Sequence, residues 1–212
     1  MLVDLSLKDS KVLIIGGGRI GLRRARTVMK ECDDVTLVSD SFAPGAKQAQ
    51  RLGAKLVNAD VADDGVLRRL LSGADLVIAA TDDLQLNRSI SRTARSLGVM
   101  IGSVDDPSHS DFNFPAVRTV GDIRVGVTTG GRSPAMARLI CKKLAGSITR
   151  EDRLRVKLMG HVRDSAKRKL ATPAARKAAV YRVLRDEKVG ALLRRGRLGE
   201  AKEVAEAIIG GA

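Results

Sequence analysis

Hydrophobic and polar positions in the first hundred residues follow two alternating patterns. Short, continuous apolar runs rich in Val and Ile are separated by stretches whose apolar side chains recur at helical spacing. Such a series predicts strands buried on both faces of a parallel sheet, with helices covering it. The fold class is therefore α/β, a Rossmann-like, doubly wound parallel sheet. The predicted strands are 11–16, 34–40, 55–60, 74–82 and 99–104, and the predicted helices are 19–30, 44–52, 67–71 and 84–97.

The pattern changes after residue 115. Two short apolar segments, 116–120 and 123–129, flank Gly121-Asp122, a pair that suits a two-residue hairpin turn. A flexible Gly-Gly turn follows. Ser133 and Pro134 then predict the N-cap and first residue of a helix that runs to about residue 144.

From residue 151 onward the chain shows only helical spacing. Thr172 and Pro173 predict a helix start, and Gly196 and Gly199 are expected to interrupt the chain before a last amphipathic segment, 200–209. Three regions follow from these patterns: a Rossmann-like domain, a hairpin and helix, and a basic helical domain. Their predicted bounds are 1–114, 115–148 and 149–212.

The formal net charge of +14 favours an anionic partner. Nucleic acid, a membrane surface and a small molecule with several acidic groups all fit this charge. Residues 151–212 hold 16 Lys/Arg and 8 Asp/Glu, so basicity is enriched towards the C-terminus. Aromatic residues make up only 2% of the chain, which argues against stacking of single-stranded bases.

Cysteine usage and hydropathy indicate the compartment. Cys32 and Cys141 are solitary, so neither a disulfide framework nor a structural metal site is expected. The N-terminal segment lacks the long apolar run of a signal peptide, and no run reaches transmembrane length. We expect a reduced, soluble, cytoplasmic protein without a membrane partner.

The stretch GGGRIG (16–21) fits the G-x-G-x-x-G pattern of dinucleotide-binding turns. It directly follows a predicted strand and opens a predicted helix, which is the context that the motif requires. In that context Gly16 permits the tight turn, Gly18 lets the backbone approach a pyrophosphate, and Gly21 allows close helix packing. The exposed N–H groups and the positive end of the helix are then expected to hold the phosphates.

Polar residues follow the second and fourth strands. Asp40 is predicted to accept from a ribose hydroxyl and to repel a 2′-phosphate, which favours NAD over NADP; a helix-capping or turn role is the alternative. Ser41 could share the ribose. Thr81 suits the floor of the cofactor cleft, whereas Asp82 and Asp83 are interpreted as the start of the next helix.

Two adjacent carboxylates, Asp105 and Asp106, follow the fifth strand on the same rim. Asp106 precedes a proline and is interpreted as a turn residue. Asp105 comes directly off the strand and is the catalytic candidate, with an ordinary rim acid as the alternative. His109 is a possible acid–base group or metal ligand, but its Ser/Pro-rich loop favours a surface histidine.

The stretch TTGGRSPAMARLI (128–140) resembles a second anion site. A Gly-Gly turn precedes a helix N-terminus, with Arg132 and Ser133 at the turn and Arg138 within the helix. Such a loop could hold a carboxylate of the substrate. An ordinary helix cap remains the alternative.

In their order, GGGRIGLRRA, VTLVSDSFAP, AATDDLQLN, VDDPSHSDFNFPA and TTGGRSPAMARLI resemble the precorrin-2 dehydrogenase / sirohydrochlorin ferrochelatase family. This family comprises the N-terminal module of siroheme synthase and its stand-alone relatives. The resemblance covers about residues 1–150. It implies NAD-dependent dehydrogenation of precorrin-2 to sirohydrochlorin in siroheme biosynthesis, Fe²⁺ insertion in some members, and a homodimer.

The resemblance also assigns roles to residues. It implies that Asp105, in the V-D-x-P motif, carries catalysis as a base or by orienting the macrocycle. It implies cofactor contacts at Arg19, Ile20, Asp40 and Ser41. Precorrin-2 is an octacarboxylate, so a basic cleft would attract it.

Two departures and two alternatives accompany this interpretation. No methyltransferase segment follows, so synthesis of precorrin-2 is not expected, and Gly21 stands where many relatives have Ala.

No permanent metal site is expected, although Fe²⁺ could bind transiently. The alternatives are a non-catalytic NAD-sensing regulatory module and a nucleic-acid-binding protein that uses the basic C-terminal helices, such as RVKLMGHVRDSAKRKL.

Overall fold

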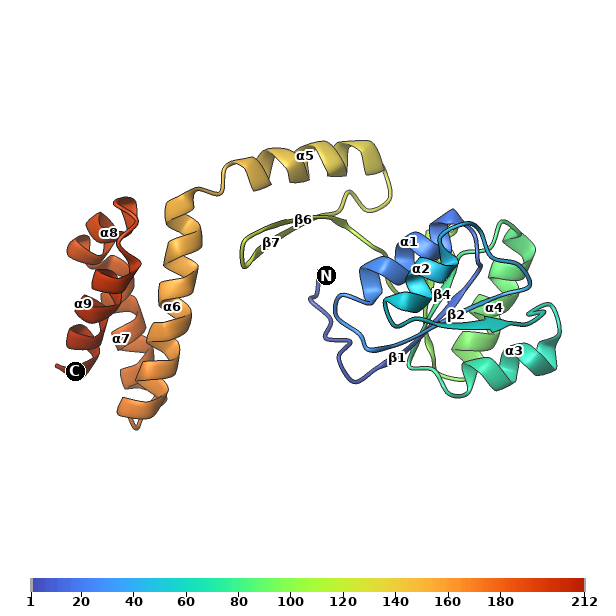
Figure 1. Cartoon of the computed structure of the whole chain (residues 1–212), viewed down its shortest axis with the longest axis horizontal. Coiled ribbons are helices and arrows are strands. Elements are labelled where there is room, and N and C mark those ends of the chain that lie inside the picture. The colour runs from blue at the N-terminus through green and yellow to red at the C-terminus, as the bar shows by residue number, and fades with distance from the viewer. Residues whose placement is uncertain (1, 212) are drawn as a thin grey trace. The chain divides into compact units, whose positions relative to one another are not determined.

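The computed structural model describes residues 2–211, which divide into two compact units (Figure 1). One unit extends to Phe114, and the other begins at Pro115. The sequence analysis expected three regions, and the boundary between 115–148 and 149–212 stays a prediction, because the second unit contains both.

The first unit is a parallel sheet of five strands in the order β3-β2-β1-β4-β5. The order reverses direction between β1 and β4, which is the doubly wound arrangement that the apolar runs predicted. Its elements are β1 (Lys11–Ile15), α1 (Arg19–Val28), β2 (Asp34–Ser39), α2 (Ala46–Arg51), β3 (Lys55–Asn58), α3 (Asp64–Leu71), β4 (Leu76–Ala79), α4 (Leu84–Ser96) and β5 (Met100–Ser103).

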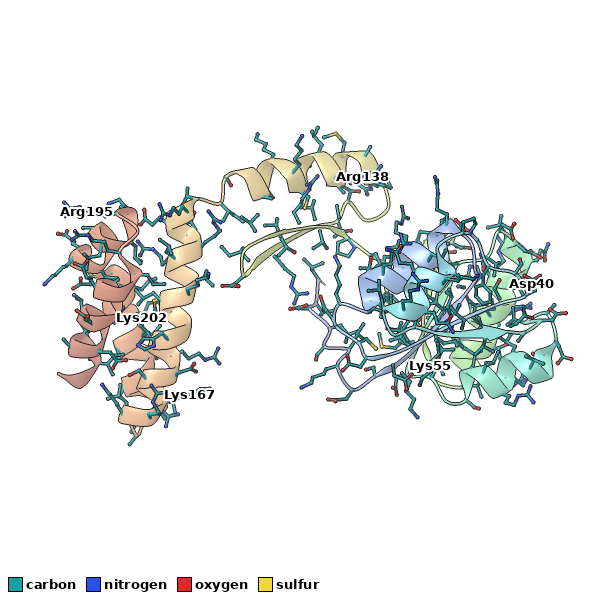
Figure 2. The ribbon with its side chains drawn as sticks, viewed as in Figure 1. Asp40, Lys55, Arg138, Lys167, Arg195 and Lys202 are labelled. Atoms are coloured by element: carbon teal, nitrogen blue, oxygen red, sulfur yellow. The ribbon has the colours of Figure 1, made fainter. Side chains whose placement is uncertain are left out.

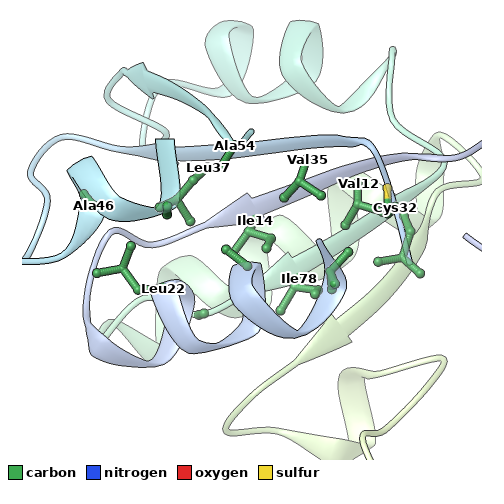
Figure 3. Packing of buried hydrophobic residues seen from close by; sticks show 14 residues of the cluster. Val12, Ile14, Leu22, Cys32, Val35, Leu37, Ala46, Ala54 and Ile78 are labelled. Atoms are coloured by element: carbon green, nitrogen blue, oxygen red, sulfur yellow. The ribbon is translucent and has the colours of Figure 1, made fainter. Parts of the chain in front are cut away.

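Alternate side chains of β1 enter two separate cores. Val12 and Ile14 pack in a cluster with residues of α1 and α2, and Figure 3 shows Ile14 between α1 and the sheet. Leu13 and Ile15 pack in a second cluster with residues of α3 and α4. Because successive side chains of a strand point to opposite faces, a continuous apolar run fills both cores.

Two helices begin at residues other than those expected. Asp63 accepts a hydrogen bond from the backbone N of Val66 (3.0 Å), so α3 starts at Asp64 rather than near residue 67. Gly45 precedes α2 with φ 106°, which delays that helix to Ala46. In both cases a local cap sets the boundary, which apolar spacing alone does not show.

The second unit begins with an antiparallel hairpin and continues as helices. Gly121 has φ 62° in the hairpin turn, as its sequence predicted. Ser133 and Thr172 cap their helices by accepting from the backbone N of Met136 and Ala175. The elements are β6 (Ala116–Val120), β7 (Ile123–Val127), α5 (Pro134–Gly146), α6 (Arg150–Lys169), α7 (Pro173–Arg185), α8 (Glu187–Arg194) and α9 (Leu198–Gly210).

The helical region differs from the expectation at two places. Asp186 ends α7 and caps α8 by accepting from the backbone N of Val189 (2.8 Å), a break that the spacing did not indicate. Gly199 was expected to interrupt the chain, but it lies inside α9; Gly196, with φ 76°, forms the turn. No helix between residues 2 and 211 is both long and apolar enough to cross a membrane.

Candidate active site

The glycine turn between β1 and α1 fits closely against its neighbours. A Cβ on Gly16, whose φ is 121°, would overlap the carbonyl of Ala80, and a Cβ on Gly21 would overlap the carbonyl of Gly16. Gly17 is equally constrained, because its Cβ would overlap the carbonyl of Ser41. The sequence pattern leaves that position free, so this third constraint was missed.

Gly18 differs from the other glycines of the turn. A Cβ there would meet no atom within 4 Å, so the space beside it is open to a ligand. Gly18 is also the N-cap of α1, without a side-chain hydrogen bond, and the first turn of α1 has no acidic residue. The N–H groups and the positive end of the helix dipole are therefore available to a phosphate.

A cleft of about 760 Å³ opens along the carboxyl ends of the strands. All of the predicted cofactor residues except Gly21 line this cleft, and so does the catalytic candidate. Gly21 is buried beneath it, in the packing role predicted for it. The residues brought together are Gly16, Gly18, Arg19, Ile20, Asp40, Ser41, Thr81 and Asp105.

Further residues that sequence reasoning did not single out line the same cleft. Several of them come from the segments after β2 and β3 and from α4. The segment after β3 carried a usable signal, since an acid ends its apolar run just as Asp40 ends the previous one. The missed residues include Phe42, Ala43, Asp60, Val61 and Leu86.

Asp40 is held at the end of β2 by its neighbours. Its backbone carbonyl accepts from Nδ2 of Asn58 at the end of β3 (2.8 Å), and its Oδ1 accepts from the Ser41 hydroxyl (3.0 Å). The side chain is exposed, and Figure 2 labels it. Asp40 and Ser41 thus present a carboxylate and a hydroxyl together, in the position of a ribose-binding pair.

Thr81 is positioned by a buried amide. Asn87 is 1% exposed; its Oδ1 accepts from the Thr81 hydroxyl (2.8 Å) and backbone N (3.2 Å), and its Nδ2 donates to the Thr81 carbonyl (3.1 Å). Asp83 caps α4 by accepting from the backbone N of Gln85 (2.7 Å), as the helix-start interpretation predicted. The role of Asn87 could not be predicted from the sequence pattern, because only folding brings its amide to the loop.

The two adjacent carboxylates have different surroundings. Asp106 caps a short 3₁₀ helix, Pro107–His109, and is half-buried. It accepts from the hydroxyl and backbone N of Ser108, and it contacts Nδ1 of His109 (2.9 Å) and Nε of Arg88 (3.4 Å). The Ser108 hydroxyl, followed by the His109 charge and the other donors, lowers the pKa of Asp106 to about 2.

Asp105 is exposed and lines the cleft. Within residues 2–211 its carboxylate makes neither a hydrogen bond nor an ion pair, so both oxygens are available to a ligand. The loop that carries it is anchored behind, because the Ser110 hydroxyl accepts from the backbone N of Ser103 (2.8 Å). The geometry therefore separates a structural acid, Asp106, from an available one. His109 contacts Asp106 and does not line the cleft.

The predicted substrate residues lie in the second unit. Ser133 caps α5, as described, while Arg132 and Arg138 are exposed. The backbone N of Arg132 donates to the carbonyl of Thr129 (3.2 Å), which closes the turn. The site residues are therefore divided between two units whose relative placement is not described. Within the described chain, no group of three or more metal-ligating side chains is found.

The charge is also divided between the units. Residues 1–114 hold 15 Lys/Arg and 15 Asp/Glu, whereas residues 115–212 hold 23 and 9, so the whole net charge of +14 belongs to the second unit. Figure 2 labels cations on four of its helical segments: Arg138 in α5, Lys167 in α6, Arg195 at the end of α8 and Lys202 in α9.

Comparison with known proteins agrees with this geometry. Residues 3–116 match a family model described as putative NAD(P)-binding. A precorrin-2 dehydrogenase of Methanosarcina barkeri is 34% identical over 188 residues, which cover 87% of this chain and 83% of that protein. Siroheme synthase 2 of Aeromonas hydrophila is 34% identical over 175 residues, 81% of this chain but 35% of that protein. The chain thus spans about a third of the siroheme synthase that it matches.

A solved structure shows the same fold over the full length. That structure is SirC, a precorrin-2 dehydrogenase, with a TM-score of 0.75, 18% identity, and coverage of 98% of this chain and 99% of that one. Its sheet, hairpin and helical region correspond to the architecture described above. The sequence identity to the Methanosarcina protein, over most of both chains, places the chain in the precorrin-2 dehydrogenase family.

Proposed function

We propose that the chain catalyses the NAD(P)-dependent dehydrogenation of precorrin-2 to sirohydrochlorin in siroheme biosynthesis. Family membership and the dinucleotide cleft support this activity. The observation that carries it is Asp105, an acid without a partner in the described chain, on the rim of that cleft. An enzyme that draws on the intracellular dinucleotide pool would work in the cytoplasm.

The residues of the cleft fit a dinucleotide. Open space beside Gly18 leaves room for a pyrophosphate, and the N-terminus of α1 directs N–H groups and a positive dipole towards it. The bound nicotinamide would supply a hydride acceptor. Dehydrogenation removes two hydrogens from the macrocycle, one as a hydride and one as a proton. Asp105 either accepts that proton or orients the macrocycle by accepting hydrogen bonds from its pyrrole N–H groups.

We assign the cofactor as NAD rather than NADP because of Asp40 and Ser41. A carboxylate at the end of β2 accepts from ribose hydroxyls and repels a 2′-phosphate. The contact between Ser41 and Asp40 keeps the two groups together, and Asn58 fixes the backbone beneath them. These contacts support a preformed ribose site.

The substrate explains the charge of the second unit. Precorrin-2 carries several carboxylates, and a net charge of +14 on one unit would attract and hold such an anion. Arg132 and Arg138, exposed at the start of α5, are the proposed contacts, with Ser133. Fe²⁺ is a proposed second substrate, because an available Asp105 could also accept the protons that metal insertion releases from the macrocycle.

We also propose that the chain forms a homodimer through α5. Ala137 and Cys141 are buried on the face of α5 towards the hairpin. The exposed surface of α5 carries four large apolar side chains at helical spacing, which is typical of a surface covered by a partner. These residues are Met136, Leu139, Ile140 and Leu144, between 37% and 58% exposed.

The test is the absorbance spectrum of precorrin-2, generated in situ without oxygen, incubated with the protein and NAD⁺ or NADP⁺. Sirohydrochlorin formation with NAD⁺ is expected. Asp105→Ala should abolish it, whereas Asp64→Ala, an exposed acid of α3 outside the cleft, should not. Asp105→Asn separates the two roles, since the amide still accepts hydrogen bonds but is not a base.

Other outcomes favour other functions. Binding of NAD⁺ without turnover by the wild-type chain would favour the sensing module. Salt-sensitive binding of duplex DNA without dinucleotide binding would favour a nucleic-acid-binding protein. Turnover that persists in Asp105→Ala would support the proposed reaction but contradict a catalytic role for Asp105.

A further inference from the structure

The strand order turns chain positions into places along the cleft. β1 is the central strand of the sheet. β2 and then β3 lie on one side of it, and β4 and then β5 lie on the other side. The glycine turn after β1 fits the pyrophosphate and Asp40 after β2 fits the adenosine ribose, while Asp105 follows β5. The base attached to that ribose must then lie towards the end of β3, and the nicotinamide on the side of Asp105.

Two hydrogen-bonding groups without partners stand at the end of β3. Asp60 uses Oδ1 to accept from the backbone N of Ala62 (2.9 Å), and within residues 2–211 its other oxygen has no partner. Val61 is 7% exposed, and its own backbone N–H finds no acceptor in the same described range. Both residues line the cleft. A consecutive acceptor and donor without partners therefore belong to two residues that line the same cleft, one of them nearly buried.

An acceptor beside a donor is the complement of one edge of adenine. The N6 amino group of adenine donates, and its neighbour N1 accepts. Hypoxanthine reverses both groups, with an oxygen at C6 and a hydrogen on N1. A carboxylate opposite C6 and a backbone N–H opposite N1 would form hydrogen bonds with adenine. With hypoxanthine, they would place an acceptor against an acceptor and a donor against a donor.

Apolar side chains surround this pair, and its backbone is fixed. The Val61 side chain belongs to the core cluster against which Leu86 of α4 packs, and Leu86 also lines the cleft. The backbone N of Ala59 donates to the carbonyl of Ser39 (3.2 Å). Since Asn58 donates to Asp40, the end of β3 is tied to the ribose site. A purine bound in the cleft beside Leu86 would meet the Asp60–Val61 edge in a position that is fixed relative to the ribose site.

We propose that Asp60, with the backbone N–H of Val61, recognises the adenine of the dinucleotide and makes this chain select NAD over its hypoxanthine analogue. This inference rests on the proposed function of the cleft as an NAD site. It adds a specificity residue to the ribose selection by Asp40, because it concerns the base rather than the 2′ position.

The experiment compares NAD⁺ with nicotinamide hypoxanthine dinucleotide. Dissociation constants come from isothermal titration calorimetry on the full chain without precorrin-2, and KM and kcat from sirohydrochlorin formation. The wild type should bind the analogue at least about tenfold more weakly, the ratio expected for about 1.4 kcal/mol of lost or opposed hydrogen bonding. The difference should lie in KM and the dissociation constant, with kcat similar for both dinucleotides.

Asp60→Asn is the informative variant. Asn keeps the turn-forming acceptor that holds the backbone N of Ala62, so folding should be retained, and thermal melting checks this. Its amide can present an NH₂ group to the hypoxanthine oxygen, so the preference for NAD should fall to about threefold or less. Asp64→Asn, an exposed acid of the neighbouring helix α3 outside the cleft, is the matched control and should keep the wild-type ratio.

Three results would contradict this inference. Equal affinity of the wild type for both dinucleotides, or an unchanged preference in Asp60→Asn, would leave Asp60 as a turn residue only, while NAD binding itself would keep the proposed function. Failure of the wild type to bind either dinucleotide would overturn the proposed NAD site together with this inference.

Discussion

The two units of this chain approach anionic ligands by different means. The first has equal numbers of acidic and basic residues and lines its cleft with glycines, N–H groups and carboxylates placed by the ends of strands. The second carries the whole net charge, and most of its cations are exposed side chains on helices. Rigid backbone groups recognise the shape of a ligand at short range. Flexible surface cations attract a ligand over about a Debye length, mainly through its net charge.

This difference suits the two proposed ligands. A dinucleotide is recognised group by group, so its site needs fixed positions. A macrocycle with several carboxylates is attracted mainly through its total charge, so cations spread over several helices suffice.

Substitutions in the glycine turn should separate stability from binding. Gly18→Ala meets no atom within 4 Å, so the melting temperature should stay within about 2 °C of the wild type, while the new methyl group should weaken dinucleotide binding by about 100-fold. Gly16→Ala, at φ 121° and against the Ala80 carbonyl, should instead lower the free energy of unfolding by about 2–4 kcal/mol. Calorimetric titration and thermal melting measure the two effects. Equal loss of stability in both variants would contradict the proposed division.

Salt should act on one substrate and not on the other. Raising the salt concentration from about 50 to 500 mM should increase KM for precorrin-2 by about tenfold, because screening weakens long-range attraction to the second unit. KM for NAD⁺ should change by less than about twofold, since short-range backbone contacts dominate. Steady-state kinetics at several salt concentrations measure both constants. A similar salt dependence of the two would contradict the contrast between the units.

Removing the charge of Asp40 should change the choice of cofactor more than it changes stability. Asp40→Ser removes the carboxylate that repels a 2′-phosphate, so the ratio of NAD⁺ to NADP⁺ affinity should fall by about tenfold. The side chain is exposed, so the melting temperature should change little. Titrations with both cofactors check this, and Asp82→Ser, another exposed acid lining the cleft, is the control. An equal change in the control would mean that only net charge matters.

Acid should weaken the second unit through Glu206 of α9. Its carboxylate accepts from the Lys169 ammonium (2.6 Å) and the Ser165 hydroxyl (2.7 Å) and contacts Nε2 of His161 (2.8 Å), all on α6. These contacts, with that of Lys169 first, lower the pKa of Glu206 from 4.5 to about 2. Because the folded pKa is the lower one, the stabilisation is present above pH 4.5 and is lost as the pH falls towards 2.

Glu206→Gln should therefore reduce stability by about 1–2 kcal/mol at pH 7 and by clearly less near pH 3. Thermal melting across this range measures the difference. Glu203→Gln, an exposed acid on the same helix, should have little effect at either pH. A destabilisation by Glu206→Gln that does not vary with pH would assign the effect to packing instead of charge.

Much of the site was predictable because it depends on backbone geometry that local sequence encodes. The G-x-G-x-x-G turn, the acid after β2 and the acid after β5 each follow an apolar run that folds as a strand, and parallel strands bring their carboxyl ends to one edge. Chain position already favoured Asp105, which follows the strand directly, over Asp106, which precedes a proline, and the resemblance to a known family added the catalytic role. The contacts of Ser108, His109 and Arg88 then show that Asp106 is the acid already engaged.

Other parts of the site depend on contacts between distant segments. Gly17 is constrained by Ser41, Thr81 is held by Asn87, and the end of β3 is tied to Asp40 through Asn58. None of these contacts follows from periodicity, because each pairs residues on different elements. The break at Asp186 was missed for a related reason, since one capping hydrogen bond decides it within an otherwise helical pattern.

The sequence by itself determined the class of the fold, the order of its strands and helices, the turn that accepts a dinucleotide and the basic character of the C-terminal half. These properties depend on local periodicity, glycine and proline chemistry, and composition, all of which are present in the unfolded chain. The tertiary structure decided which polar groups remain without partners among residues 2–211, such as the Asp105 carboxylate, the second oxygen of Asp60 and the Val61 N–H. Whether a donor or acceptor is free depends on what folding places beside it, and that is a property of the assembled molecule.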